Sequence, residues 1–392
     1  MKKRFPGFYI LIPFLFFAFP AGAADIRLMT QNQYLGADLA AIVAAPDAEA
    51  FNAAVVAALQ KVAANIPAER MKALAADIAK EQPALVGLQE VYQFQCIDLV
   101  QPAISRTGCS DPSIAAAFSD HLQATLDALN GNYVEKATVV NLNIPGVPFF
   151  INGIPALVSV VDRDVILARN GVDATPVDYT AFQSAGVCLK PSADGCNYSF
   201  VIVANSALGP ISLERGFVAV DATVNGKAYR MVNTHLELQF PDQTNPLSEV
   251  FQAAQAGELL QVLVNTTPLD RSLVVVGDMN SSPDHPAIPG LGILTPYKQF
   301  IEAGFTDIWQ LRPGGLPGYT CCQLEDLSNR QSALYERDDL IFSLDIPSGV
   351  KNTRVVGATV SDKTPPSGLG LWPSDHASVT ADLQFQLRSA QK

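Results

Sequence analysis

The sequence predicts an α/β protein built from two mixed β-sheets that pack face to face, with helices on their outer sides. Runs of β-branched residues alternate with Ala-rich segments of helical period near the N-terminus, and hairpin and strand patterns dominate the rest. Apolar residues make up 48% of the chain and charged residues only 16%, so a large core is expected. The 392 residues show no internal repeat, charge run or linker, and we therefore expect one domain rather than two.

The first 23 residues have the order of a secretory signal peptide. Basic residues at positions 2–4 precede an apolar stretch from Phe8 to Phe19, and small residues follow up to Ala23. The apolar stretch is too short and too interrupted by proline to span a membrane. We expect cleavage after Ala23, a secreted or periplasmic location, and a single mature domain over 24–392.

Acidic residues outnumber basic residues in this chain. It carries 26 Lys and Arg against 38 Asp and Glu, and removing the three basic residues of the leader leaves an excess of 15 acidic groups. Such a surface repels polyanions at long range, which disfavours a nucleic-acid partner bound by charge alone. A local basic groove or a bound cation would reverse this field, so nucleic acid remains an alternative partner.

Six cysteines in an exported chain predict disulfide bonds. The pairs that would each close a short loop are Cys96–Cys109 and Cys188–Cys196. Cys321 and Cys322 are adjacent, and three states stay open for them: a vicinal bridge, two separate partners, or free thiols. A zinc site is disfavoured, because no cysteine pair has a histidine at ligand spacing.

The N-terminal part alternates strands and helices. Asp25–Thr30 alternates apolar and polar residues as a strand does, and Ala84–Leu88 is a short apolar run typical of a buried strand. Between them Asp47–Lys80 is Ala-rich with helical period, and Pro67 should break it into two helices. Ser113–Leu129 predicts a further amphipathic helix, ended by an Asn-Gly pair.

The pattern loosens in an elaborated insertion around 96–160. Its segment Val139–Val161 is unusually apolar and rich in Gly and Pro. We expect a long loop packed on the core, and the alternative is an exposed apolar loop that meets lipid or substrate. Asp164–Ala168 then returns to strand character.

The strongest hairpin signal is Asn225-Gly226, which separates strand patterns at Phe217–Val224 and Lys227–Thr234. The remaining predicted elements are a helix at Ser248–Val264, a buried strand at Leu273–Val276, a strand beginning within Arg337–Phe342, and a strand at Val379–Phe385.

Polar residues follow the ends, or precede the starts, of six predicted strands. They are Asn32, Glu90, His235, Asp278 with Asn280, Asp339, and Asp375 with His376. Each alone has a structural explanation; Asp278 and Asn280, for example, are ordinary residues of a turn that closes a strand. Six repetitions of this placement indicate a functional surface, because functional groups collect on loops held by a rigid scaffold.

These residues lie in six short motifs. The motifs are Thr30-Gln31-Asn32, Leu88-Gln89-Glu90, Asn233-Thr234-His235-Leu236, Gly277-Asp278-Met279-Asn280, Arg337-Asp338-Asp339-Leu340-Ile341 and Ser374-Asp375-His376. As an ordered set, which spans nearly the whole mature chain, they resemble the motifs of the endonuclease/exonuclease/phosphatase superfamily. That superfamily includes DNase I-like nucleases, inositol-phosphate phosphatases and neutral sphingomyelinases. The resemblance implies a DNase I-like, four-layered α/β/β/α sandwich with a divalent-metal site at one end.

The resemblance also implies a metal site made of oxygen ligands. Glu90 would be the principal ligand, with Asn32 and Asp375 close by. Ligands of this kind favour Mg²⁺ or Mn²⁺ over zinc.

The same resemblance assigns roles to the other motif residues. His376 would be the general base that takes a proton from water, oriented by Asp339 through its other ring nitrogen. Asp278 and Asn280 would position the attacking water and a phosphoryl oxygen. His235 would donate a hydrogen bond or a proton to the phosphate.

Two more residues are candidates by this resemblance. Asp162 precedes an apolar strand and would support His235, although a simple surface charge explains it equally well. Arg215 lies just before the hairpin and would contact a phosphate through its forked guanidinium group, although an exposed turn arginine is the alternative. In the fifth motif Asp338 and Leu340 replace the apolar and aromatic residues that usually flank its aspartate, and we assign the role to Asp339.

The function implied is a secreted, metal-dependent phosphoesterase that hydrolyses phosphodiester bonds by attack of water. We favour a lipid head group or small molecule as substrate, because the mature chain is acidic and the apolar Ile144–Leu157 segment could make transient contact with a membrane surface. The alternatives are a secreted DNase I-like endonuclease and a non-catalytic binding module on the same fold. We infer no obligate protein partner.

Overall fold

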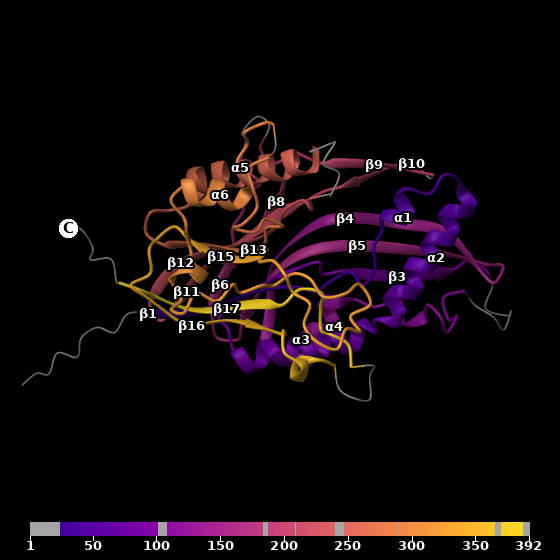
Figure 1. The fold of residues 1–392 in the computed structure, drawn as a ribbon, viewed down its shortest axis with the longest axis horizontal. Coiled ribbons are helices and arrows are strands. Elements are labelled where there is room, and N and C mark those ends of the chain that lie inside the picture. The colour runs from indigo at the N-terminus through magenta and orange to yellow at the C-terminus, as the bar shows by residue number, and fades with distance from the viewer. Residues whose placement is uncertain are drawn as a thin grey trace, which may run out of the picture.

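The computed structural model describes residues 24–100, 108–182, 187–207, 209–239, 247–288, 290–364 and 370–386, so the predicted leader lies outside the described residues. Two mixed sheets pack face to face between two helical layers, as Figure 1 shows. The four-layered α/β arrangement expected from the sequence is confirmed. Among the described residues, no helix is long and apolar enough to cross a membrane.

The first sheet has seven strands. Their order is β16 (Gly349–Val356), β17 (Ser378–Phe385), β1 (Ala24–Asn32), β2 (Leu85–Gln89), β5 (Ile154–Arg169) and β3 (Gln93–Asp98), with β4 (Tyr133–Ile151) also paired to β5. Strands β1 and β2 are parallel, whereas the other pairs are antiparallel. The parallel pair brings the C-terminal ends of β1 and β2 to the same edge.

The second sheet has eight strands. Their order is β14 (Thr306–Asp307), β15 (Asp339–Ser343), β13 (Ser272–Asp278), β12 (Lys227–His235), β11 (Gly216–Val224), β8 (Gly195–Asn197) and β7 (Lys190–Pro191), with β6 (Asp173–Pro176) also paired to β11. The predicted hairpin is confirmed, since β11 and β12 pair from Val224 and Lys227 onward around Asn225-Gly226. Strands β12 and β13 are parallel. A separate two-stranded ribbon consists of β9 (Ile202–Ser206) and β10 (Gly209–Leu213).

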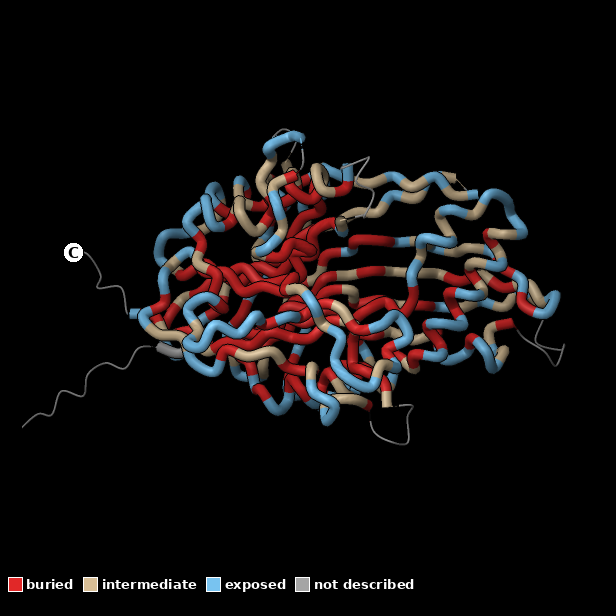
Figure 2. The backbone as a smooth tube through the Cα atoms, in the orientation of Figure 1, coloured by how far each residue is buried: buried red, intermediate tan, exposed pale blue. Residues whose placement is uncertain are grey.

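The main core lies between the two sheets. From β17, Val379, Ala381 and Leu383 enter it as the predicted alternation requires. Opposite residues from the second sheet include Val220 and Val276. Side chains of both inner faces are almost fully buried, and Figure 2 shows this band of buried backbone through the centre of the molecule. Burial of this apolar surface is the main stabilising contribution to the fold.

Helices cover both outer faces. On the first sheet they are α3 (Pro67–Glu81) and α4 (His121–Ala128), and on the second sheet α5 (Leu247–Thr266) and α6 (Pro296–Glu302). The remaining helices are α1 (Ala40–Val43), α2 (Ala48–Ala64) and the 3₁₀ turns η1 (Ala115–Ala117), η2 (Ile308–Leu311) and η3 (Val360–Asp362). The predicted break at Pro67 is confirmed, because Pro67 is the first residue of α3.

The helix predicted over Ser113–Leu129 is shorter than expected. Its carboxylate cap is Asp120, which accepts hydrogen bonds from the backbone of Leu122 and Gln123, so α4 begins at His121. The residues before Asp120 form only the turn η1. Aspartate competes with the backbone for hydrogen bonds, and here it stops the helix at its N-terminal end.

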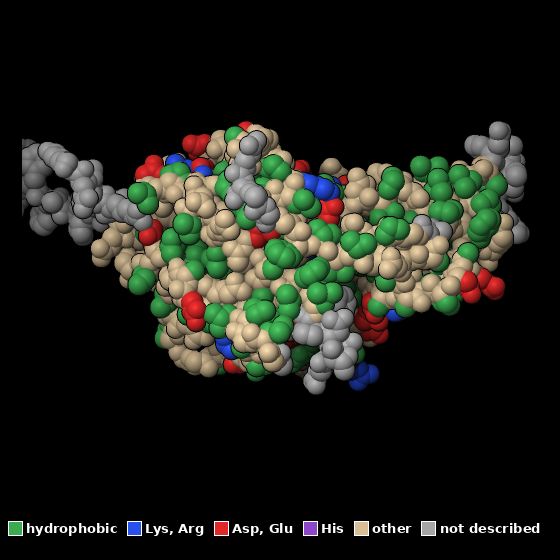
Figure 3. All heavy atoms as spheres, turned by 90° about the horizontal axis from the view of Figure 1, so that it is seen from above, with side chains coloured by type: hydrophobic (Ala, Val, Ile, Leu, Met, Phe, Trp, Pro, Cys, Tyr) green, Lys and Arg blue, Asp and Glu red, His purple; other side chains and the backbone are tan. Residues whose placement is uncertain are grey.

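The prediction of a long loop over Val139–Val161 is wrong. This segment is the distal half of a hairpin in which β4 and β5 pair up to Ile151 and Ile154 around Asn152-Gly153. Helix α2 packs on it, and Phe149 and Ala156 are fully buried in the cluster that they share with that helix. Figure 3 shows hydrophobic side chains gathered at the end of the molecule that carries α1 and the β9–β10 ribbon.

All six cysteines are paired. The predicted bridges Cys96–Cys109 and Cys188–Cys196 are present, with Cα atoms 5.7 and 5.5 Å apart. Cys321 and Cys322 are bridged to each other, which selects the first of the three states left open by the sequence.

Candidate active site

The six motifs meet at one edge of the sheet sandwich. In the second sheet His235 pairs with Asp278, and Asp278 pairs with Asp339, so three candidate residues lie side by side on neighbouring strands. In the first sheet Asn32 ends β1 beside Gln89, which precedes Glu90. The placement expected from strand ends is therefore observed.

Gly277 lets the two parallel strands approach closely at this edge. It has φ +148°, and a Cβ atom there would lie 1.9 Å from the carbonyl oxygen of Thr234. Only glycine fits this position without moving the backbone. The close approach sets Asp278 beside His235.

Asp278 is the central carboxylate of the site. Its Oδ2 accepts a hydrogen bond from Asn32 Nδ2 at 3.0 Å and lies 3.7 Å from the nearest nitrogens of both His235 and His376. Its Oδ1 accepts the backbone N–H of Asn280 at 2.9 Å. Burial raises the pKa of this carboxyl group, but the two histidines and these hydrogen bonds outweigh it and lower the pKa.

His376 and Asp339 form a hydrogen-bonded pair. The Nδ1 of His376 lies 2.8 Å from Asp339 Oδ2, which leaves Nε2 for another partner. Burial raises the pKa of Asp339 to about 6. Burial disfavours the charged ring, but the nearby carboxylates of Asp339, Asp278 and Asp375 raise the pKa of His376 well above its ordinary value. The pairing chosen at the fifth motif, Asp339 rather than Asp338, is the one in the structure.

His235 has a different environment. Arg215 Nη1 lies 2.9 Å from its Nδ1, and Asn280 Nδ2 lies 3.1 Å from its Nε2. A neutral imidazole has one acceptor nitrogen, so only one of these two N–H donors can be satisfied by the ring. Burial and the positive charge of Arg215 lower the pKa of His235 to about 3. The ring is therefore neutral near pH 7.

Asp162 does not pair with His235 in the structure. Arg215 takes that place, and Asp162 is a buried carboxyl group whose Oδ1 has no hydrogen-bond partner. Burial raises its pKa to about 7, although Arg215 acts in the opposite direction. The contact expected from the resemblance is thus replaced by an arginine, itself linked to Glu237 at 3.5 Å.

Of the three candidate metal ligands, Glu90 and Asp375 are partly exposed, whereas Asn32 is fully buried. Glu90 accepts hydrogen bonds from Asn32 Nδ2 at 3.2 Å and from the backbone of Leu35 at 2.8 Å. Burial, with a further contribution from Glu90, raises the pKa of Asp375 to about 7. These oxygen donors and their mutual repulsion fit a hard divalent cation.

Two positioning residues carried no clear signal in the sequence. Arg70 is fully buried in α3 and donates hydrogen bonds to the carbonyl oxygens of Gln33, Tyr34 and Pro373 at 2.8, 3.0 and 3.1 Å. It thereby ties the end of β1 to the loop that carries His376. Its one signal is a charged residue on the apolar face of a predicted helix.

Thr320 is the other positioning residue. Its Oγ1 accepts the backbone N–H groups of both Asp338 and Asp339 at 3.1 Å, and its carbonyl oxygen accepts the N–H of Ala377 at 2.8 Å. Thr320 therefore fixes the distance between the two members of the His376–Asp339 pair. Nothing in the sequence distinguishes this threonine from an ordinary loop residue.

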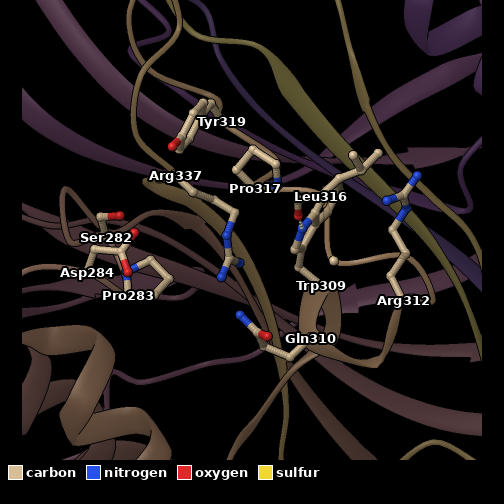
Figure 4. Close-up of a pocket in the computed structure, with 11 residues that line it drawn as sticks. Ser282, Pro283, Asp284, Trp309, Gln310, Arg312, Leu316, Pro317, Tyr319 and Arg337 are labelled. Carbon is tan, nitrogen blue, oxygen red and sulfur yellow. Dashed lines mark hydrogen bonds between the residues drawn. The ribbon is translucent and has the colours of Figure 1, made fainter.

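A pocket of about 230 Å³ lies along the same loops. Figure 4 shows Trp309, Tyr319 and Arg337 around it, and its wall also includes Ser282. Ser282 follows Asn280 by two residues, Arg337 precedes Asp339 by two, and none of the catalytic candidates lines the pocket. The pocket is a neighbour of the site rather than the site itself.

The chain matches the model of the endonuclease/exonuclease/phosphatase family over residues 62–376. A comparison with curated proteins finds no match. Among solved structures, a family protein from Bacteroides thetaiotaomicron is 15% identical and covers 93% of this chain and 99% of its own, with a TM-score of 0.50. A second, from Beutenbergia cavernae DSM 12333, is 18% identical and covers 92% of this chain and 72% of its own, with a TM-score of 0.47. A structure of D. rerio TDP2 complexed with single strand DNA product is 13% identical and covers 91% of this chain and 98% of its own, with a TM-score of 0.45.

Members of the matched family are hydrolases of phosphoester bonds, and they typically use divalent metals. The match spans five of the six motifs, from the second to the sixth, and ends at His376. The chain therefore belongs to the endonuclease/exonuclease/phosphatase family.

Proposed function

We propose that this protein is a divalent-metal-dependent phosphodiesterase in which His376 activates the attacking water. The observation that carries this proposal is the His376–Asp339 hydrogen bond of 2.8 Å. In the neutral ring this bond would hold the proton on Nδ1 and leave Nε2 to accept a proton. Asp339 also stabilises the imidazolium ion that forms.

The opposite side of the site would bind the phosphoryl group. Arg215 and Asn280 both present N–H groups to His235, and the neutral ring can accept from only one of them. The other donor is then available to a phosphoryl oxygen. A neutral His235 would itself donate a hydrogen bond rather than a whole proton, which refines the role expected from the sequence.

Glu90, Asp375 and Asn32 would hold Mg²⁺ or Mn²⁺. When bound there, the cation would neutralise charge that develops on the phosphoryl group and, by offsetting the carboxylates, lower the pKa of His376 towards the range of a useful base.

For the substrate we propose a phosphodiester in a lipid head group or small molecule, acted on outside the cytoplasm after removal of the leader. The acidic balance of the chain supports this preference. The apolar segment of the insertion supports it less than expected, because Phe149 and Ala156 are buried against α2 and Phe150, 56% exposed, is the one large apolar side chain of the segment that is mostly exposed.

The first experiment measures initial rates on a substrate panel, with Mg²⁺ and with excess EDTA. The panel contains bis(p-nitrophenyl) phosphate, p-nitrophenyl phosphate, sphingomyelin vesicles, inositol phosphates and plasmid DNA. We expect phosphodiester hydrolysis that EDTA abolishes. Rapid plasmid nicking without lipid or small-molecule hydrolysis would replace the preferred substrate by DNA, and full activity in EDTA would refute the metal dependence.

A binding measurement separates the metal from the chemistry. Mg²⁺ or Mn²⁺ should raise the melting temperature of the wild-type protein, because it neutralises carboxylates that repel one another in the folded state. Glu90→Gln should lose most of this increase. The matched control is Glu69→Gln, a partly exposed helix residue paired with Lys72, which should keep this increase. An equal increase in both variants would remove Glu90 from the metal site.

A further inference from the structure

Two adjacent cysteines lie against the proposed general base. The Sγ of Cys322 is 4.0 Å from Nε2 of His376, and Cys321 belongs to the same cluster, in which all three ligand atoms lie within 4.8 Å of one another. Cys321 and His376 are buried and Cys322 is partly exposed. None of the roles proposed above uses these sulfur atoms.

Backbone hydrogen bonds hold this segment on both sides of the cysteines. The carbonyl oxygen of Thr320 accepts the N–H of Ala377 at 2.8 Å, and the N–H of Gln323 donates to the carbonyl oxygen of Asp375 at 2.8 Å. These bonds do not involve sulfur. The two cysteine side chains therefore stay beside the loop that carries His376 whether or not their sulfurs are bonded to each other.

The orientation of His376 suits a metal ion at Nε2. Its Nδ1 faces Asp339 Oδ2 at 2.8 Å, and metal-binding histidines commonly donate their second ring N–H to a carboxylate in this way. This hydrogen bond leaves Nε2 near Cys322, where it can offer its lone pair to a metal ion once its proton is displaced.

A second cluster, made of His285, Glu336 and Asp338, does not present a ring nitrogen to a metal ion in this way. The Nδ1 of His285 accepts the backbone N–H of Ser282 at 3.2 Å, so its Nε2 carries the ring hydrogen and donates it to Glu336 at 2.9 Å. A metal ion at Nε2 would have to break both hydrogen bonds. Among the described residues, His376 also belongs to a cluster with Asp278 and Asp339, but those carboxylates face its Nδ1. The cluster with the two cysteines is the one that lies at its Nε2.

We propose that Cys321 and Cys322, once reduced, form with His376 Nε2 a three-ligand site for a soft divalent cation such as Zn²⁺. Zinc takes thiolate ligands at about 2.3 Å and imidazole ligands at about 2.0–2.1 Å, which sets its tetrahedral ligands roughly 3.5–3.8 Å apart. The present 4.0 Å between Cys322 Sγ and His376 Nε2 is already close to that spacing. Thiolate ligands select zinc over magnesium, unlike the oxygen ligands around Glu90.

The chemistry needs a reductant of the dithiol class. The dithiol delivers two electrons and two protons, the S–S bond between Cys321 and Cys322 breaks to give two thiols, and the reductant closes its own disulfide. Binding of Zn²⁺ then releases to solvent the two thiol protons and, from a protonated His376 ring, the Nε2 proton as well.

Occupation of this site would block the nitrogen that takes the proton from water. Reduced and zinc-loaded protein would therefore not hydrolyse phosphodiesters, whereas oxidised protein would. This consequence rests on the proposed function, but the metal site itself does not, so the two are tested by different measurements.

The site is tested with Cd²⁺ as a spectroscopic probe. Protein reduced with dithiothreitol, and freed of it by gel filtration under argon, is titrated with Cd²⁺ while the ultraviolet thiolate-to-cadmium charge-transfer band is recorded. The double variant Cys321→Ser/Cys322→Ser should lose the component of this band that comes from tightly bound Cd²⁺. Oxidised protein should not show this component. The matched control Cys96→Ser/Cys109→Ser removes another bridge and should keep the tight band. His376→Gln should weaken binding roughly tenfold or more.

The consequence is tested by activity. One equivalent of Zn²⁺ should lower the turnover of reduced wild-type protein by roughly tenfold or more, because it removes the general base. The Cys321→Ser/Cys322→Ser variant should keep the rate it has without zinc. An equal cadmium band in wild type and this variant would overturn the site. A band specific to the two cysteines without loss of turnover would leave the site standing and count against His376 as the base.

Discussion

His376 and His235 lie on either side of one carboxylate, but their surroundings shift their ionisation in opposite directions. Asp278 Oδ2 is 3.7 Å from a ring nitrogen of each. Burial disfavours both imidazolium ions; carboxylates around His376 outweigh it, whereas Arg215 reinforces it at His235. Paired groups with pKa values pushed apart are typical of sites that use one residue as base and another as hydrogen-bond donor.

His376→Ala should lower the turnover of bis(p-nitrophenyl) phosphate by roughly 10²–10⁴-fold, the usual range for a lost general base. Asp339→Asn should cause a smaller loss, because the ring keeps a hydrogen-bond partner but loses the charge that stabilises its cation. Circular dichroism checks that both variants fold. The control His285→Ala removes a histidine that has no role in the proposed mechanism, and it should retain near-native turnover. If His376→Ala kept the turnover of the wild-type protein, His376 would not be the general base.

Arg215→Met should raise the pKa of His235. The guanidinium cation lowers this pKa in the wild-type protein, and an apolar side chain removes that contribution while burial still holds the pKa below its ordinary value. We expect a rise of roughly one unit, measured by ¹⁵N-histidine NMR titration, where the chain presents four histidines. Arg163→Met, whose guanidinium pairs with Asp120, is the matched control. If the pKa of His235 did not change, its lowering in the wild-type protein would come from burial and not from Arg215.

At the scale of the elements, the site depends on how closely β12 and β13 approach. Gly277→Ala should lower the free energy of unfolding by on the order of 2–4 kcal/mol, because the new methyl group would meet the carbonyl oxygen of Thr234 at 1.9 Å. The control is Gly131→Ala. Gly131 also has a positive φ, +74°, but open space surrounds it, so this substitution should lower the free energy of unfolding by only about 1 kcal/mol. Urea denaturation measures both. Equal losses would show that backbone conformation alone, and not the contact between strands, requires Gly277.

The sequence predicted strand ends better than it predicted contacts between them. The period-2 alternation of β17 and the Asn225-Gly226 turn are local signals, and both are confirmed. The resemblance to the family implied that His376 meets Asp339, and the structure brings the two together at 2.8 Å. Their catalytic roles stay predictions.

Side-chain contacts at the site were harder to predict than the strands that carry them. Arg215 was expected to face a phosphate and its contact with His235 was not predicted, although the predicted hairpin of β11 and β12 sets the neighbouring Gly216 opposite His235. The insertion was also misjudged. Gly and Pro within Val139–Val161 predicted a loop, but pairing along β4 and β5 tolerates them at register shifts, one of which lies between Ile144 and Val147.

At the scale of the whole molecule, three of the described arginines near the site are already paired with carboxylates. Arg163 lies 2.6 Å from Asp120, Arg337 lies 2.6 Å from Asp307, and Arg215 lies 3.5 Å from Glu237. Lys and Arg are also not gathered into a patch on the face drawn in Figure 3. In the part of the chain that the structure describes, these three arginines therefore add little to the uncompensated positive surface that duplex DNA binding normally uses.

This charge distribution predicts how salt affects activity on a polyanion. With Mg²⁺ held constant, raising NaCl from about 10 to about 150 mM shortens the Debye length from about 30 to about 8 Å. Because the chain without its leader, with 15 more acidic than basic groups, repels DNA, screening should raise kcat/KM for plasmid DNA or leave it very low throughout. It should change kcat/KM for bis(p-nitrophenyl) phosphate little. The small substrate serves as the control for effects of salt on the chemistry. A kcat/KM for plasmid that falls steeply with salt, while the small substrate is unaffected, would reveal counterion release from a basic groove and favour a nuclease over the lipid or small-molecule phosphodiesterase.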